Sequence, residues 1–238
     1  QPADKRISTA AVVLLDNNRG ELRALVGSID YYAHDAGQVN GAIAVRSPGS
    51  ALKPFIYAAA FTRNLVTPAE PIADIRTDFH TRGGDYNPEN YSRSYHGPIS
   101  VRQALACSYN IPAVKMLQRT GIITVLQDLR ALHFDTLDKT ADWYGLTLAL
   151  GGGNVTLLQL ATAYQVLARG GEYRPTRMIR RIETRDGVDL ELSPEPAFRV
   201  YSPAAAFLIG DILADNDART PEFSAYSPLR MPFFCAAK

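Results

Sequence analysis

Ser50 and Lys53 stand three residues apart in the stretch RSPGSALKPFIYAAAF, where an apolar, alanine-rich run begins. On a helix, residues at this spacing lie on one face, about 5–6 Å apart at Cβ, so the lysine amine can reach the serine hydroxyl. A helix N-terminus and burial both disfavour an ammonium, which leaves Lys53 able to act as a base. A serine becomes a good nucleophile once a base takes its proton. The pair therefore predicts acyl-transfer chemistry at Ser50.

A plain structural interpretation competes with this one: Ser50 would only cap the helix, and Lys53 would be a solvated residue of its first turn. The flanking residues favour catalysis. Gly49 lets the backbone turn sharply and approach a ligand closely, and Pro54 is tolerated in a first turn. Further motifs are needed to decide between the two interpretations.

The stretch ACSYNIPAV supplies a second candidate. A helix from Val101 should end near Cys107, and Pro112 suits the first turn of the next helix. Ser108 and Asn110 would then project from a tight loop between two helices. A hydroxyl there can relay a proton, and a carboxamide can hold a substrate amide or a lysine. Serine and asparagine are common loop residues, so this motif alone is weak.

The elements that must position these residues have clear boundaries in the sequence. Residues 8–28 predict a hairpin of two buried strands turning at Asn17, Asn18 and Gly20. Capping boxes at Ser100/Gln103 and Thr156/Gln159 open two helices, and Ser202-Pro203 opens a third. Gly170-Gly171 should end the helix that starts at Thr156.

Residues 177–192 predict a second hairpin turning at Asp186-Gly187, and residues 231–238 resemble a strand. Strands at both ends and helices between them predict an α+β fold, with a mainly antiparallel sheet flanked by helices. We find no internal repeat and no composition shift, so residues 1–238 are expected to form one domain.

Composition excludes several functions. The formal net charge is +1, with 25 basic and 24 acidic residues dispersed along the chain, so nucleic acid is not an expected partner. The apolar runs are shorter than a membrane span, so any anchor or targeting segment is expected outside this chain. Two cysteines and four scattered histidines do not suggest a zinc site, and no cofactor is expected. A disulfide between Cys107 and Cys235 stays open.

Taken in order, Ser50-x-x-Lys53, Ser108-x-Asn110 and Lys238 resemble the three motifs of penicillin-binding proteins. The likeness covers nearly the whole chain and includes PISVRQALACSYNIPAVKML and LALGGGNVTLLQLATAYQVLARGG. The chain is similar to the class A transpeptidase domains, and the stretch RSPGSALKPF looks most like the penicillin-binding protein 1C branch. The family pattern continues with Thr or Ser and then Gly after its third-motif lysine, whereas this sequence stops at Lys238. On this resemblance the domain is cut at that lysine, without its closing strands.

The resemblance implies a role for each motif residue. Ser50 would be the acylated nucleophile, Lys53 its general base and Ser108 the proton relay to the leaving amine. Asn110 would bind the donor peptide, while Lys238 would set the electrostatics and hold Ser108. The expected substrates are peptidoglycan stem peptides ending in D-Ala-D-Ala, and β-lactams would bind covalently. The resemblance also implies a periplasmic or extracytoplasmic location, with attachment to the inner (cytoplasmic) membrane through a segment outside this chain.

Two other functions compete with a D,D-transpeptidase. A hydrolytic β-lactamase would need a base that activates water for deacylation, and no Glu followed at a suitable spacing by Asn occurs in a loop after the second motif. A non-catalytic module of the same fold, acting in β-lactam sensing or cell-wall assembly, stays open. Tyr109 is expected to pack rather than catalyse, and Gly151–Gly153 to form a turn. The tyrosine-rich loop of residues 83–100 either walls the cleft or folds on its own aromatic side chains.

Overall fold

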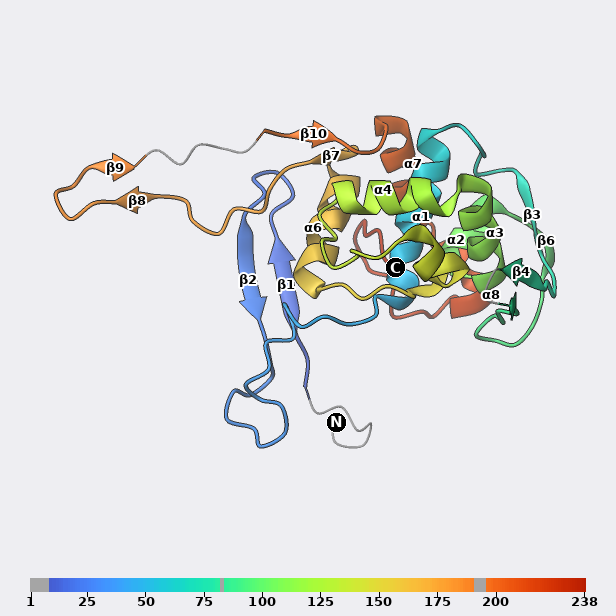
Figure 1. Ribbon diagram of the computed structural model, residues 1–238, viewed down its shortest axis with the longest axis horizontal. Helices are drawn as coiled ribbons and strands as arrows, with labels where there is room; N and C mark the ends of the chain where they lie inside the picture. Colours follow the sequence, from blue (N-terminus) through green and yellow to red (C-terminus); the bar gives the residue numbers. More distant parts are fainter. Residues whose placement is uncertain (1–8, 82–83, 191–195) are drawn as a thin grey trace.

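Helix α1 (Lys53–Thr62) lies at the centre of the molecule and follows the short 3-10 turn η2 (Gly49–Leu52) (Figure 1). The computed structural model describes residues 9–81, 84–190 and 196–238. Every side chain from Phe55 to Phe61 is buried. A helix that is apolar on all sides must be covered on all sides, so this helix forms the core to which the other elements attach.

The other helices surround α1. Helices α3 (Asn110–Thr120), α4 (Ile122–Ala131) and α7 (Pro203–Ala214) pack directly on it, and α6 (Leu157–Ala168) packs on α7. The remaining helical elements are α2 (Val101–Ala106), α5 (Ala141–Tyr144), η3 (Gly145–Leu150) and α8 (Asn216–Phe223).

The predicted helix starts are confirmed. Thr156 and Gln159 form the complete capping box of α6, with Gln159 N 3.1 Å from Thr156 Oγ1 and Thr156 N 3.0 Å from Gln159 Oε1. Ser100 Oγ accepts from Gln103 N at 3.1 Å, and Ser202 Oγ accepts from Ala205 N at 3.1 Å. Helix α6 ends at Ala168, and Arg169 caps it just before the glycine pair. These local signals fix where each helix begins and ends.

The strands within the described ranges form five antiparallel pairs rather than one extended sheet. The mixed α+β class is nevertheless confirmed. The pairs are β1 (Val12–Leu15) with β2 (Leu22–Val26), β3 (Pro71–Asp74) with β6 (Gly97–Ser100), β4 (Phe79–Thr81) with β5 (Gly84–Tyr86), β7 (Glu172–Tyr173) with β10 (Phe198–Arg199), and β8 (Ile182–Glu183) with β9 (Asp189–Leu190).

Both predicted hairpins are present. Strands β1 and β2 pair from Val12↔Val26 to Leu15↔Leu22, but the expectation of two buried strands is wrong, because Val12 is 53% and Leu14 56% exposed. Helix α6 packs on β1, and alternate side chains of the strand therefore face away from it. The β8–β9 hairpin projects as an arm from the body (Figure 1), and residues 191–192 of the prediction lie outside the described ranges.

Residues 231–238 are not a strand, which corrects the sequence-based expectation. Extended backbone becomes a strand only when a neighbouring strand supplies a ladder of hydrogen bonds. Here the neighbour is the end of a helix: Ala237 N donates to Leu213 O at 3.0 Å. The buried Arg219 guanidinium holds the same segment by donating to Ala237 O at 3.1 Å. Lys238 is therefore positioned by α7 and α8.

Candidate active site

Ser50 lies in the η2 turn, which a neighbouring segment braces from behind. Gly49 has φ +54°, and Ser47 Oγ donates to Gly151 O at 2.8 Å. Gly151 lies so close to the turn that a Cβ built on it would be 2.4 Å from Gly49 N. Arg46 and Val155 exchange backbone hydrogen bonds of 2.9 and 2.8 Å beside this contact. The glycine run is thus a turn, as predicted, and it holds the backbone that carries Ser50.

Lys53, the first residue of α1, is completely buried. Its Nζ donates to Ser108 O at 2.5 Å and to Asn110 Oδ1 at 2.6 Å, and it lies 3.4 Å from Ser108 Oγ. Desolvation by burial lowers the pKa of Lys53 to about 7. A lysine in this state exchanges its proton near neutral pH, which is the property required of a general base. The plain interpretation of Lys53 as a solvated residue is excluded by its burial.

Ser108 belongs to the tight connection between α2 and α3, where it adopts the left-handed conformation with φ +63°. A non-glycine residue pays a conformational cost there, and such residues cluster at functional sites. The backbone on either side is fixed, because Ser108 N donates to Leu105 O at 3.1 Å and Tyr109 N to Ala104 O at 3.1 Å. This strained turn aims both the carbonyl and the hydroxyl of Ser108 toward Lys53.

Asn110 is the first residue of α3 rather than a loop residue, and its side-chain amide and backbone N–H are all hydrogen-bonded. Its Oδ1 accepts from Lys53, its Nδ2 donates to Glu89 O at 2.7 Å, and its backbone N–H donates to Asn90 Oδ1 at 2.8 Å. The predicted second motif therefore meets the first motif through the lysine.

Lys238 approaches the same region from the C-terminal segment. Its Nζ donates to Leu105 O at 3.1 Å, near the end of α2. Desolvation and the positive charge of Lys53 hold the pKa of Lys238 well below its usual value. In the described part of the chain its hydrogen bond goes to this carbonyl, so the predicted contact with Ser108 is not formed as a direct bond.

A cleft of about 380 Å³ lies over these residues, lined by Ser50, Tyr91, Cys107, Ser108, Tyr109, Asn110, Glu222 and Phe223. Tyr91 brings the tyrosine-rich loop to the cleft wall, although its side chain is 97% exposed. Within the described ranges, the Ser50 hydroxyl makes no hydrogen bond to a protein group, and no hydrogen bond joins it to Lys53. An unengaged hydroxyl at the cleft wall is available to a ligand.

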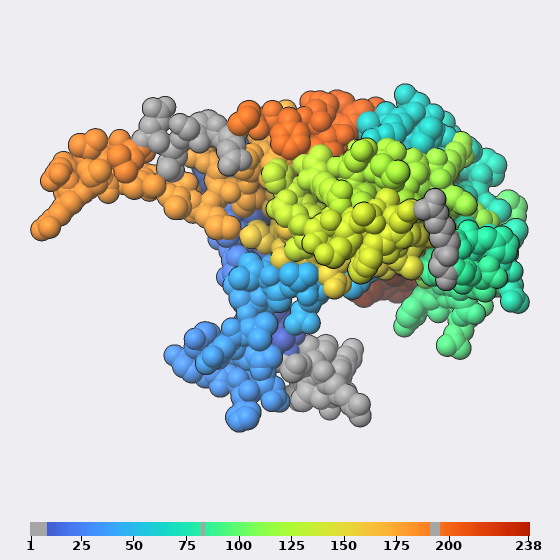
Figure 2. Space-filling view, in the orientation of Figure 1, coloured from blue at the N-terminus to red at the C-terminus, as the bar shows by residue number. Residues whose placement is uncertain are grey.

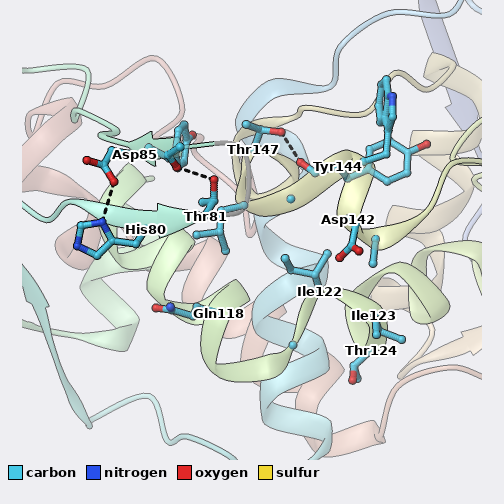
Figure 3. A pocket seen from close by; sticks show the side chains of 17 residues that line it. His80, Thr81, Asp85, Gln118, Ile122, Ile123, Thr124, Asp142, Tyr144 and Thr147 are labelled. Carbon is cyan, nitrogen blue, oxygen red and sulfur yellow. Dashed lines mark hydrogen bonds and ion pairs between the residues drawn. The ribbon is translucent and has the colours of Figure 1, made fainter.

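A larger hollow of about 840 Å³ lies elsewhere, between the β4–β5 hairpin, the start of α4 and the α5–η3 segment (Figure 3). His80 and Asp85 form an ion pair on one side, and Thr147 donates to Tyr144 O on the other. None of the five predicted site residues lines it. Size therefore does not identify the candidate active site.

Sequence reasoning missed Asp74, Asn90, Glu222 and Phe223. Asp74 and Asn90 are buried; Asn90 bonds Asn110 directly and links it to Asp74. Glu222 and Phe223 bring α8 to the cleft. These contacts join residues 16 to more than 100 positions apart, so no local pattern could have revealed them.

The cysteines are both free thiols, and the predicted alternative of a disulfide is not realised. Cys107 donates from its thiol to Ala218 O at 3.2 Å and ties α2 to α8, while burial raises its pKa. Tyr109 packs as expected, with its buried ring stacked on His96 at a centroid distance of 4.2 Å.

The described residues contain neither a metal-binding cluster nor a membrane-spanning helix. No group of three or more His, Cys, Asp or Glu side chains there could hold a metal ion. In the same residues, no helix has the length and apolar character to cross a membrane.

Residues 10–225 match the family model of the penicillin binding protein transpeptidase domain, so the chain belongs to that family. Penicillin-binding protein 1C of Escherichia coli is 33% identical over 216 residues, which cover 90% of this chain and 26% of that protein. Penicillin-binding protein 1A of Neisseria meningitidis is 32% identical over 214 residues, covering 86% and 26%. The chain thus spans about a quarter of these relatives, and the predicted likeness to class A proteins is confirmed.

Solved structures agree with this placement. Penicillin-binding protein 1A from Haemophilus influenzae has a TM-score of 0.75 and 28% sequence identity, covering 87% of this chain and 35% of that chain. The transpeptidase domain of penicillin-binding protein 3 from Burkholderia pseudomallei has a TM-score of 0.70 at 22% identity, covering 96% and 65%. The second likeness shows the fold alone.

Proposed function

We propose that this chain is a peptidoglycan D,D-transpeptidase domain that works through an acyl-enzyme on Ser50 and binds β-lactams at the same serine. Its donor substrate would be a stem peptide ending in D-Ala-D-Ala, and its acceptor an amine on a neighbouring stem. Because this substrate lies outside the cytoplasmic membrane, the domain would act in the periplasm. We further propose that the described elements belong to one domain and that Lys238 is its third-motif lysine.

In the first half-reaction, neutral Lys53 takes the proton of the Ser50 hydroxyl. Ser50 Oγ then bonds to the carbonyl carbon of the penultimate D-Ala, and the amide C–N bond breaks. Ser108 relays the proton from Lys53 to the leaving D-Ala amine. Ser50 N–H, at the start of a helical turn, would be one donor to the oxyanion.

In the second half-reaction, the acceptor amine attacks the Ser50 ester. A C–N bond forms, the C–Oγ bond breaks, and the proton of the amine returns to Ser50 through Lys53. Asn110 would bind the donor peptide from the cleft wall, and Lys238 would contribute to the electrostatics beside it. With a β-lactam, the leaving amine stays tethered to the acyl group after the ring opens, and a long-lived adduct is expected.

One observation carries this proposal. A completely buried lysine with a pKa of about 7 lies three residues after a serine of the cleft wall, and it is held by the backbone carbonyl of Ser108 and by Asn110. Burying an amine is costly. A chain that needed only packing at this position would be better served by an apolar side chain.

The test is to follow attachment and release of a fluorescent penicillin. Rapid covalent attachment with slow release is expected, together with transfer of a D-Ala-D-Ala donor peptide to an added amine. Rapid release would instead indicate a hydrolase. No attachment at all would contradict the proposal and favour a non-catalytic module.

A further inference from the structure

The buried carboxylate of Asp74 lies behind the candidate active site, at the end of β3. It is completely inaccessible to solvent and receives four hydrogen-bonding contacts. Asn90 Nδ2 lies 2.8 and 2.9 Å from its two oxygens, while His96 N and Nδ1 lie 3.0 and 2.7 Å from Oδ2. A carboxylate can only accept, so the amide nitrogen of Asn90 must face it.

This contact decides how the Asn90 amide is turned. Its second N–H is also engaged, because Asn90 Nδ2 donates to Ser94 O at 2.9 Å. With both hydrogens directed to acceptors, the oxygen of the amide must face the other way. There it accepts from the backbone N–H of Asn110 at 2.8 Å. The start of α3 is therefore tied to Asp74 through one oriented amide.

The same segment also orients the Asn110 side chain. Glu89 O, next to Asn90, accepts from Asn110 Nδ2 at 2.7 Å, which leaves Asn110 Oδ1 to accept from Lys53 Nζ at 2.6 Å. If the Asn110 amide turned over, its nitrogen would face the lysine and its oxygen would face a carbonyl. The oxygen–carbonyl contact would be unfavourable, and Lys53 would lose an acceptor.

A second contact links Asp74 to the Ser108–Asn110 motif. His96, held by Asp74, stacks on the ring of Tyr109 between the two motif residues. The Asp74 carboxylate thus bonds both Asn90 and His96, which support the Ser108–Asn110 motif, although Asp74 does not line the cleft.

We propose that Asp74 and Asn90 are positioning residues that hold the start of α3 and the Glu89–Asn90 segment, and thereby keep the Asn110 amide oxygen in place as the acceptor seen by Lys53. The role in catalysis rests on the proposed function; the orientation itself does not. Asp74 acts by polarity: as an acceptor without hydrogens, it permits one orientation of the Asn90 amide, whose oxygen then holds the backbone N–H of Asn110.

The test uses Asp74→Asn, which keeps the shape of the side chain but can present hydrogens to Asn90. Two properties are measured: the titration of Lys53, followed by NMR of its ε-carbon, and the rate of acylation by a fluorescent penicillin. An oxygen acceptor stabilises the ammonium, so moving the Asn110 amide oxygen away from Lys53 should lower the Lys53 midpoint. Acylation should slow by about 10- to 100-fold.

Other charged or titratable groups near Lys53 stay unchanged in this comparison. They are Lys238 from the C-terminal segment, Cys107 at the end of α2 and Glu222 on α8. The matched control is Asp128→Asn. It removes another buried carboxylate, which lies on α4 and bonds the Arg63 guanidinium. It should lower stability and leave both measured properties of the folded protein unchanged.

The double variant Asp74→Asn with Asn90→Asp reverses donor and acceptor between the two positions and should restore part of both properties. If Asp74→Asn does not fold, Asn90→Ala should show the same two changes. A folded Asp74→Asn protein with an unchanged Lys53 midpoint, or one indistinguishable from Asp128→Asn, would overturn the proposal. A wild-type protein that is never acylated would defeat the proposed function, while the NMR titration would still decide the orientation.

Discussion

The Lys53 amine is the proposed base for Ser50, and its two shortest hydrogen bonds suit the neutral form. A neutral amine has two hydrogens and one lone pair. Its two short contacts, to Ser108 O and Asn110 Oδ1, account for both hydrogens. The lone pair is then left for a hydroxyl, which is the arrangement a base requires.

The first prediction follows from the lowered pKa of Lys53. Acylation by penicillin should increase with pH and level off above about 7, as the ammonium loses its proton. Lys53→Met should lower the rate by about 10²–10⁴ and abolish this pH dependence. Lys115→Met is the control, since that half-buried lysine bonds Ala73 O on β3. A rate that does not change between pH 6 and 8 would exclude Lys53 as the base.

At this scale the sequence predicted which residues gather but not how they are held. Motif spacing within a helix and a short loop is a local property, so it predicts the pairs Ser50 with Lys53 and Ser108 with Asn110. That the two pairs meet, as Lys53 and Asn110 do, is expected from the family resemblance. Asp74 and Asn90 carry no local signature. Their importance arises from burial beside Asn110, which depends on how β3, the loop after β5 and α3 pack together.

At the scale of elements, the position of Ser50 depends on the turn before α6. Gly151 and Gly170 both have positive φ, +87° and +67°, but they differ in their surroundings. A Cβ at Gly151 would lie 2.4 Å from Gly49 N, whereas one at Gly170 would have nothing within 4 Å. Alanine at Gly170 would therefore add backbone strain alone, whereas alanine at Gly151 would add strain and also displace η2.

The second prediction is that Gly151→Ala slows acylation by about 10- to 100-fold, because the added methyl pushes the η2 turn away. Gly170→Ala should lower stability by about 1 kcal/mol and leave the rate per folded molecule unchanged. Both are read by stopped-flow acylation with active-site titration. Equal rates in the two variants would show that the Gly151 contact does not position Ser50.

Elements defined by short-range signals were the predictable ones. The caps at Ser100, Thr156 and Ser202 and the turn at Asp186-Gly187 each depend on a few neighbouring residues. The pairing of β3 with β6 was not predicted, because each strand is four residues long and its partner lies more than 20 positions away. Residues 231–238 had the composition of a strand, but α7 supplies their hydrogen bond.

At the scale of the whole molecule, the body around α1 is dense, while the β8–β9 arm and the loop after β2 extend away from it (Figure 2). Lys53 sits inside that body, so its titration is linked to folding. In the unfolded chain it holds its proton up to about pH 10.5, whereas the folded protein releases it near 7. Between these values unfolding takes up a proton, and the free energy of unfolding therefore rises with pH.

The third prediction is a slope of up to about 1.4 kcal/mol per pH unit from Lys53 over about pH 7.5–9.5, measured by urea unfolding. Lys238, whose pKa is also lowered, adds a slope of the same sign. Above about pH 10 the buried tyrosines, including Tyr57 and Tyr164, reverse it, because their raised pKa values favour proton release on unfolding. Lys53→Met should remove the uptake of up to one proton on unfolding and so reduce the slope by up to about 1.4 kcal/mol per pH unit. Identical slopes in both proteins would contradict a deprotonated buried lysine.

The most direct measurement is the site of covalent attachment. The protein is treated with a labelled penicillin, digested, and mapped by mass spectrometry, alongside Ser50→Ala and Ser108→Ala. We predict a single adduct on Ser50 in the wild-type protein, none in Ser50→Ala, and a slower adduct at the same residue in Ser108→Ala. An adduct on Ser108 or on any other residue, or one that persists in Ser50→Ala, would contradict Ser50 as the nucleophile.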